Sequence, residues 1–217
     1  MPTIVINLPS HGVTEDDLNK IREIMPDYDV RVTQDREECK SIRDDVEILA
    51  GWPVADLLLS APNLRWYQQW AAGSDWLQRY PEAVERPFLV TNASGVHPIQ
   101  IAEHVLALML AFVRRLPQAI HNQAEHKWDA PPGETVGELY QRTLLVVGMG
   151  AIGERIARVA NALGMRVSGT RRSAVKPPAG VEAIYTPDRL LDVLPQADFV
   201  VLAAPLTPET MCMIGEH

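Results

Sequence analysis

The sequence predicts an α/β protein built from two domains, each with a parallel sheet. First, short apolar runs typical of buried strands alternate with helical patterns along the 217 residues. Second, a long apolar helix expected at Ile99–Leu116 separates an earlier strand–helix series from a later one. We therefore expect one domain over residues 1–98 and another over residues 99–217.

The expected strands are short runs of apolar and β-branched residues. In the first domain they are Thr3–Asn7, Tyr28–Thr33, Val46–Ala50, Leu64–Gln68 and Phe88–Thr91. In the second they are Thr143–Val147, Met165–Thr170, Val181–Tyr185 and Asp198–Ala203. Further helices are expected after the N-cap residue Thr14, from Pro53, and over Gln118–Lys127, Ala151–Leu163 and Pro187–Leu194.

The composition is that of an ordinary globular protein, with 47% hydrophobic and 22% charged residues. The net charge of -8 argues against nucleic acid or an anionic membrane as the main partner, since both attract basic proteins. The longest apolar run, Val105–Val113, is too short to span a bilayer. The two cysteines, Cys39 and Cys212, lack the spacing of a metal site. We expect no metal, no disulfide framework and a cytoplasmic location.

A glycine-rich loop follows the expected strand Thr143–Val147 and precedes a helix. Its residues are Gly148, Met149, Gly150, Ala151, Ile152 and Gly153. This GxGxxG spacing, placed between a strand and a helix, is typical of dinucleotide-binding sites, where free N–H groups and the helix dipole attract the pyrophosphate. A glycine-rich turn without a ligand is the structural alternative.

The end of the next strand bears on which dinucleotide binds. NAD sites usually place an acidic residue there to bind the ribose 2′-hydroxyl. Here the chain has the candidate cofactor residues Thr170, Arg171, Arg172 and Ser173, with no acidic residue between Arg155 and Val181. Two guanidinium groups and a hydroxyl suit a 2′-phosphate. The sequence therefore favours NADP, with NAD as the alternative; two solvated surface arginines would be the structural explanation.

Several stretches together resemble the D-isomer-specific 2-hydroxyacid dehydrogenase family, in particular its glyoxylate/hydroxypyruvate reductases. They are Leu64–Trp66, Ala71–Asp75, Thr91–Gly95, Ile101–Leu110, the glycine loop and Ala197–Thr210. The resemblance implies a flavodoxin-like substrate domain and a Rossmann dinucleotide-binding domain that is incomplete at its C-terminal end. It also implies a homodimer formed through the helix at residues 99–116.

The resemblance implies roles for particular residues. The turn Ala72, Gly73 and Ser74 is similar to the family loop whose backbone amides hold the substrate carboxylate, and consecutive N–H groups in a turn form an anion nest. The segment Ala204, Pro205, Leu206 and Thr207 is similar to the one that follows the dinucleotide toward the nicotinamide. His97 is a candidate for substrate contact, although a loop histidine without such a role is the simpler interpretation.

The catalytic Arg, Glu and His of the family lie beyond His217, so we assign no catalytic residue to this chain. The strand at Asp198–Ala203 is apolar on both faces, as expected for a central parallel strand, yet too few residues follow Pro205 for a crossover and another strand. We therefore expect the front portion of a longer protein, or a chain that has lost its end.

The resemblance implies an oxidoreductase that transfers hydride between NADP(H), or NAD(H), and a small 2-oxo or 2-hydroxy acid. One alternative is a non-catalytic dinucleotide-binding dimer or an inactive fragment. Another alternative keeps the enzyme class but has formate or phosphite as the substrate. The segment His97–Gln100 leading into the long helix does not favour it, because the segment lacks an Asn-Ser-x-Ser pattern.

Overall fold

A computed structural model describes residues 1–9, 12–130, 132–173 and 176–215, and it divides into two compact units. The first unit contains Met1–Ser94 and Leu206–His217, and the second contains Gly95–Pro205. The division between the units falls between Ser94 and Gly95, close to the boundary expected after residue 98. The segment Leu206–His217 groups with the first unit.

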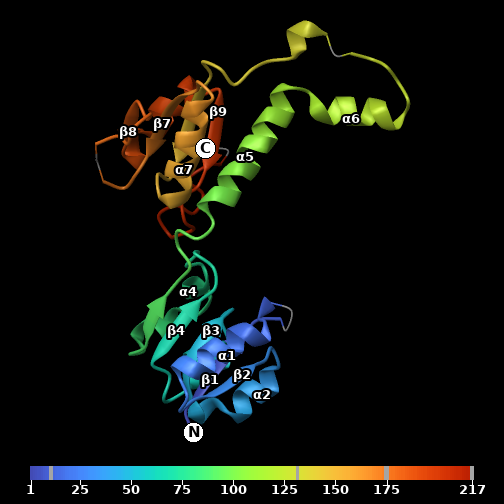
Figure 1. The fold of residues 1–217 in the computed structure, drawn as a ribbon. Helices are drawn as coiled ribbons and strands as arrows, with labels where there is room; N and C mark the ends of the chain where they lie inside the picture. Colours follow the sequence, from blue (N-terminus) through green and yellow to red (C-terminus); the bar gives the residue numbers. More distant parts are fainter. Residues whose placement is uncertain (10–11, 131, 174–175, 216–217) are drawn as a thin grey trace. The chain divides into compact units, whose positions relative to one another are not determined.

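The first unit is built on five parallel strands in the order β2-β1-β3-β4-β5 (Figure 1). The strands are β1 Thr3–Asn7, β2 Asp29–Val32, β3 Val46–Gly51, β4 Trp66–Gln69 and β5 Leu89–Thr91. The helices are α1 Glu15–Ile24, α2 Arg36–Ser41, α3 Ala55–Ser60 and α4 Trp76–Arg79. This strand order is that of the flavodoxin-like fold and confirms the expected architecture, although the sequence did not predict α2 or α4.

The alternation of side chains along β1 explains why helices cover both faces of this sheet. Ile4 and Ile6 pack with Leu18 of α1, whereas Val5 points the other way and packs with Leu57 of α3. All five side chains are buried. Each helix therefore buries an apolar stripe against one face of the sheet.

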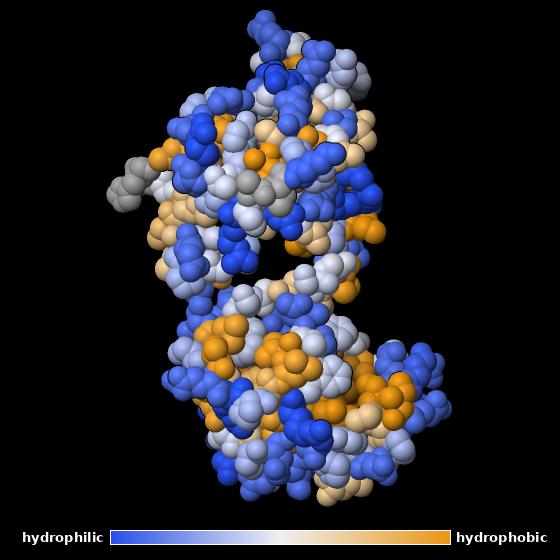
Figure 2. All heavy atoms as spheres, turned by 90° about the vertical axis from the view of Figure 1, so that its left-hand side faces the viewer, coloured by the Kyte–Doolittle hydropathy of each residue, from blue (hydrophilic) through white to orange (hydrophobic). Residues whose placement is uncertain are grey.

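The edge strand β5 carries exposed apolar side chains, with Leu89 and Val90 62% and 42% exposed. Figure 2, which looks onto the left-hand side of Figure 1, shows apolar side chains on this side of the first unit.

Among the described residues, none of the helices has the length and apolar character needed to span a membrane.

The second unit contains four parallel strands in the order β8-β7-β6-β9 (Figure 1). The strands are β6 Thr143–Val147, β7 Arg166–Thr170, β8 Ala183–Tyr185 and β9 Phe199–Leu202. The helices are α5 Pro98–Val113, α6 Leu116–Ala124, α7 Ala151–Ala162 and α8 Leu190–Val193. This is the arrangement of the first four strands of a Rossmann sheet, as expected.

The core of the second unit lies between α5, α7 and the sheet. Leu106 of α5 and Ile156 of α7 pack in one buried cluster with Val146 of β6. On the other edge, β9 pairs with β6 alone among the described residues, and its Leu202 side chain is 60% exposed.

Several expected helices differ in extent from the observed ones; the helix expected at Gln118–Lys127, for example, is α6 at Leu116–Ala124. The helix expected at Ile99–Leu116 ends as α5 at Val113, because Arg115 adopts a left-handed conformation with φ of 55°. Pro117 follows this end and lies in the first turn of α6, where its missing N–H costs nothing. The helix expected at Pro187–Leu194 is instead the short α8 between two 3-10 turns.

Candidate functional site

The glycine loop is shaped by close backbone contacts at its first and last glycines. Gly148 has φ of +103°, and a Cβ there would lie 2.4 Å from the backbone nitrogen of Ala204. A Cβ on Gly153 would lie 2.2 Å from the carbonyl oxygen of Gly148. Both positions therefore require glycine, the first for the turn beside the end of β9 and the second for the approach of α7 to the loop.

The middle glycine has a different environment. A Cβ on Gly150 would meet no atom within 4 Å, so the space above it is open. Gly150 is the N-cap of α7, and the N–H groups of Gly150, Ala151 and Ile152 donate to no other described residue. Free N–H groups at a helix N-terminus beside open space fit a phosphate group.

Buried contacts with β7 hold this loop. The Gly148 N–H donates to Oγ1 of Thr170 at 3.3 Å, and the Met149 N–H donates to the Thr170 carbonyl at 2.9 Å. The Met149 side chain packs where a Cβ of Gly169 would lie. Thr170 is 4% exposed and Met149 2%, so the structure places both behind the loop rather than on its open surface.

The two arginines after β7 differ in their surroundings. Arg171 pairs with Glu154 of the first turn of α7, with 3.3 Å between Nη1 and Oε1. Both side chains are about half exposed, so this pair contributes little to stability. Arg172 and Ser173 are exposed and have no side-chain partner among the described residues. The pair brings Arg171 beside the first turn of α7.

The segment Ala204–Thr207 is divided between the units. Ala204 contacts the glycine loop through its backbone, as the Gly148 geometry shows, and Pro205 remains with the second unit. Leu206 and Thr207 group with the first unit, where the Leu206 carbonyl accepts a hydrogen bond from Nε2 of Gln78 at 3.2 Å.

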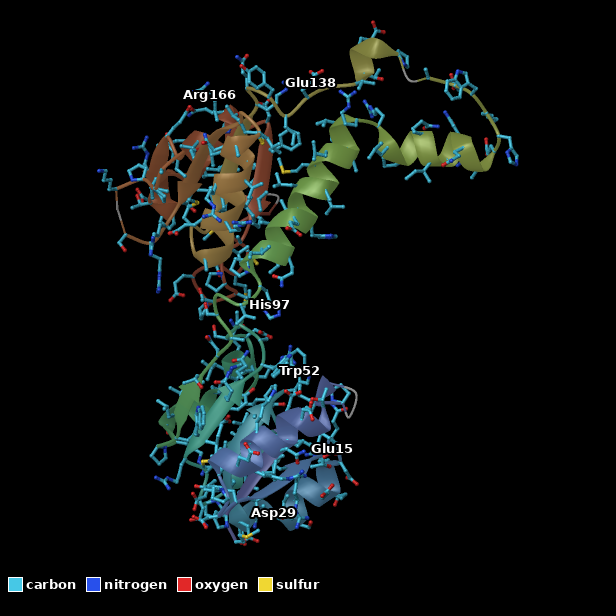
Figure 3. The ribbon with its side chains drawn as sticks, in the orientation of Figure 1. Glu15, Asp29, Trp52, His97, Glu138 and Arg166 are labelled. Atoms are coloured by element: carbon cyan, nitrogen blue, oxygen red, sulfur yellow. The ribbon has the colours of Figure 1, made fainter. Side chains whose placement is uncertain are left out.

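In the first unit, the turn Ala72–Ser74 lies at the carboxyl end of β4. None of the N–H groups of Ala72, Gly73 and Ser74 donates to another described residue, and the turn is exposed or half-exposed. Trp52 follows the neighbouring strand β3 and lies at the same carboxyl ends of the strands, opposite Asp29 at the start of β2 (Figure 3). Open parallel sheets bind their ligands outside the carboxyl ends of the strands.

The carbonyl groups of the same turn are occupied. The Ala71 carbonyl accepts from the Ala93 N–H at 3.3 Å, and the Ala72 carbonyl accepts from Nδ2 of Asn92 at 3.3 Å. The Gly73 carbonyl accepts from Nε2 of Gln69. The loops after β4 and β5 are thereby joined, while the three successive N–H groups donate to no other described residue. We call the turn Ala72–Ser74 the candidate anion nest, and its contact with an anion stays a prediction.

His97 lies near the start of the second unit and is the N-cap of α5 (Figure 3). Its side chain is exposed and makes no capping hydrogen bond. It therefore belongs to a different unit from the candidate anion nest, and its contact with a substrate stays a prediction.

A comparison with known families accounts for the glycine loop and its surroundings. The family model for "D-isomer specific 2-hydroxyacid dehydrogenase, NAD binding domain" matches residues 106–217, which is just over half of the chain. The chain belongs to this family. The family's cofactor class fits the residues found here, because three N–H groups of the loop donate to no other described residue and Gly150 faces open space.

Curated relatives also match the first unit. Glyoxylate reductase of Korarchaeum cryptofilum is 40% identical over 75% of this chain and 49% of its own length. D-3-phosphoglycerate dehydrogenase of Methanocaldococcus jannaschii is 31% identical over 100% of this chain and 41% of its own length. The chain thus spans about half the length of these curated relatives.

A solved structure shows the same two-domain fold. It is a D-isomer specific 2-hydroxyacid dehydrogenase family protein from Aeromonas salmonicida, with a TM-score of 0.78 and 28% identity. The likeness covers 96% of this chain and 66% of that one. It confirms that a 2-hydroxyacid dehydrogenase fold runs through both units of this chain.

Sequence reasoning missed the residues that support the site. Gln69 and Asn92 hold carbonyls of the candidate anion nest, and Glu154 pairs with Arg171. The only sequence signal for Glu154 is its place directly after Gly153. A polar residue at the end of an apolar strand, such as Gln69, is a weak sign of a ligand-binding edge.

Proposed function

We propose that this chain forms the substrate- and cofactor-binding portion of an oxidoreductase that reduces a small 2-oxo acid to the D-2-hydroxy acid with NADPH. The observation that carries the proposal is the turn Ala72–Ser74, whose three N–H groups donate to no other described residue while the Ala72 and Gly73 carbonyls are bonded. Such a nest fits a carboxylate. Curated relatives named glyoxylate reductase support the substrate class.

The dinucleotide would be held by residues of the second unit. The N–H groups of Gly150, Ala151 and Ile152 would bind its pyrophosphate. Arg171, Arg172 and Ser173 would bind the 2′-phosphate of NADP through charge-assisted hydrogen bonds. When bound, the nicotinamide supplies the hydride. We place Ala204–Thr207 along the nicotinamide side, as the resemblance to the family implies. We also propose His97, which follows the loop Thr91–Gly95, as a substrate contact.

A steady-state assay tests the activity. The complete protein should oxidise NADPH in the presence of glyoxylate, hydroxypyruvate or pyruvate, and should use NADH less well. Absence of turnover with every pair of substrate and cofactor would refute the proposal.

Replacement of both arginines tests the cofactor. Arg171→Ala and Arg172→Ala should each weaken NADPH binding by about 1–3 kcal/mol, the contribution of a charged hydrogen bond, and should spare NADH. Equal losses for the two cofactors would refute the 2′-phosphate role. Isothermal calorimetry with each dinucleotide measures the difference.

We also infer a homodimer formed through α5 and a cytoplasmic location. On α5, Leu108 and Phe112 are 58% and 68% exposed, and an apolar helix face of this kind is usually covered by a partner. The location is proposed because the sequence has only two cysteines, Cys39 and Cys212, and therefore no pattern of a disulfide framework.

A further inference from the structure

One side chain connects the carboxyl end of β4, the candidate anion nest and the start of α4. Gln69 is the last residue of β4 and is 5% exposed. Its Nε2 donates to the Gly73 carbonyl, and its Oε1 accepts from Nε1 of Trp76 at 2.6 Å. Both halves of this buried amide are therefore used.

The chemistry of Trp76 fixes the orientation of the Gln69 amide. An indole N–H can only donate, so it must face Oε1, which turns Nε2 toward the Gly73 carbonyl. Trp76 itself is held in place. It is 3% exposed, and its ring packs against that of Tyr67 in a T-shaped arrangement, with 5.1 Å between centroids and an interplanar angle of 87°. The donor is thus fixed by packing that reaches into the core.

The bond to the Gly73 carbonyl determines where the next N–H points. In a trans peptide the C=O of one residue and the N–H of the next lie in one plane and point in opposite directions across the C–N bond, and none of the described peptide bonds is cis. With the Gly73 carbonyl turned toward Gln69, the Ser74 N–H points away from it. Asn92 acts in the same way on the Ala72 carbonyl and the Gly73 N–H.

We propose that Gln69 is a positioning residue that aims the Ser74 N–H at the substrate carboxylate. This rests on the function proposed above, in which the nest holds that carboxylate. Without the Gln69 donor, the peptide between Gly73 and Ser74 is free to rotate. The Ser74 N–H is then no longer directed at the substrate carboxylate. Gln69 itself touches neither substrate nor cofactor.

Gln69→Glu tests this role because it changes the donor and little else. The introduced carboxylate still accepts from Trp76, but it presents an oxygen to the Gly73 carbonyl where the amide presented an N–H. We expect KM for glyoxylate and the Kd of the unreactive analogue oxamate, measured with saturating NADPH, to rise about tenfold. The kcat and the Kd of NADPH should change less than about threefold, because the glycine loop lies in the other unit. Gln34→Glu, in an exposed loop of the same unit, is the matched charge control. It should change neither KM for glyoxylate nor the Kd of oxamate.

A pH series separates positioning from general damage. Below the pKa of the introduced carboxyl group its O–H can donate to the Gly73 carbonyl again, so the ratio of variant to wild-type Kd for oxamate should shrink from pH 8 to pH 5. If Gln69→Glu does not fold, Trp76→Phe replaces it, since this change keeps the ring against Tyr67 but frees the Gln69 amide. Trp76→Phe should raise KM for glyoxylate and the Kd of oxamate by a smaller factor than Gln69→Glu.

The outcomes separate the two proposals. Wild-type protein that neither reduces a 2-oxo acid nor binds oxamate refutes the proposed function, and with it the role of Gln69. Wild-type protein that does both, combined with unchanged oxamate binding in a folded Gln69→Glu variant, refutes the role of Gln69 alone. Unchanged binding in Trp76→Phe does the same where Gln69→Glu fails to fold.

Discussion

Thr170 and Gly148 are joined by a hydrogen bond in which the glycine N–H donates to the threonine hydroxyl at 3.3 Å. The bond connects the end of β7 to the first residue of the glycine loop, and the Thr170 carbonyl also accepts from Met149. The residue expected to contact the cofactor is therefore buried behind the loop and sets its shape.

Thr170→Val should lower both stability and cofactor affinity. Valine has nearly the same shape but offers no acceptor to the Gly148 N–H, and an unpaired N–H in a partly buried site costs about 1–3 kcal/mol. Urea denaturation should show a loss of this size in the free energy of unfolding, together with weaker NADPH binding. Stability equal to that of the wild type would show that water replaces the hydroxyl at no cost.

Gly148→Ala should reduce stability, whereas Gly150→Ala should reduce cofactor affinity. At Gly148 the new Cβ meets the Ala204 backbone and φ is +103°, so we expect a loss of about 3 kcal/mol or more in unfolding free energy. At Gly150 the Cβ meets nothing within 4 Å, so stability should change by less than about 1 kcal/mol while NADPH affinity falls about tenfold or more. Thermal unfolding and calorimetric titration measure the two effects. Weak binding without instability at Gly148 would contradict this division of roles.

The features predicted correctly from the sequence are those encoded locally. The strand at Thr3–Asn7 and the glycine loop were predicted at their observed positions, since apolar runs and GxGxxG spacing are readable over a few residues. The end of α5 was not, because Arg115 adopts a left-handed conformation that glycine or asparagine would have signalled.

The support of the candidate site could not be predicted in the same way. Asn92 reaches the Ala72 carbonyl across 20 positions of sequence, and Arg171 reaches Glu154 across 17. These residues meet because parallel strands bring their carboxyl ends to one edge, but the register that selects each partner depends on the packing of the whole sheet. The Gln69 and Gly73 pair is closer in sequence, yet no pattern indicates which carbonyl a buried amide will bind.

Glu154→Gln should increase the preference for NADPH. In the free protein Glu154 neutralises Arg171, so removal of its charge leaves the guanidinium available to a 2′-phosphate. We expect the Kd of NADPH to fall about two- to fivefold, the range for an exposed ion pair, and that of NADH to change less. Glu182→Gln is the matched control, because Glu182 pairs with Arg166 at the opposite end of β7. A similar shift in both variants would assign the effect to net charge.

Phe112→Glu should convert the proposed dimer to a monomer. A charge placed on the exposed apolar face of α5 would have to be desolvated in the interface. Leu191→Glu is the control, since Leu191 is 72% exposed on α8 in the same unit and should leave the dimer intact. Sedimentation velocity at several concentrations distinguishes the states. A wild-type monomer, or a dimer unaffected by Phe112→Glu, would rule out α5 as the interface.

Asp198 should make the joint between β6 and β9 sensitive to acid. Hydrogen bonds from the Thr143 N–H and hydroxyl, at 2.8 and 2.7 Å, lower the pKa of Asp198 below its ordinary value of 3.8, and Arg142 adds to the effect. A carboxyl group whose pKa is lowered by folding stabilises the folded state above its unfolded pKa, and this contribution is lost as pH falls through the folded value. The stability difference between wild type and Asp198→Asn should therefore be largest above about pH 5 and shrink below pH 3.8. Urea denaturation from pH 7 to pH 2.5 measures this difference, and a constant gap across the range would show that the charge of Asp198 plays no part in holding β9 to β6.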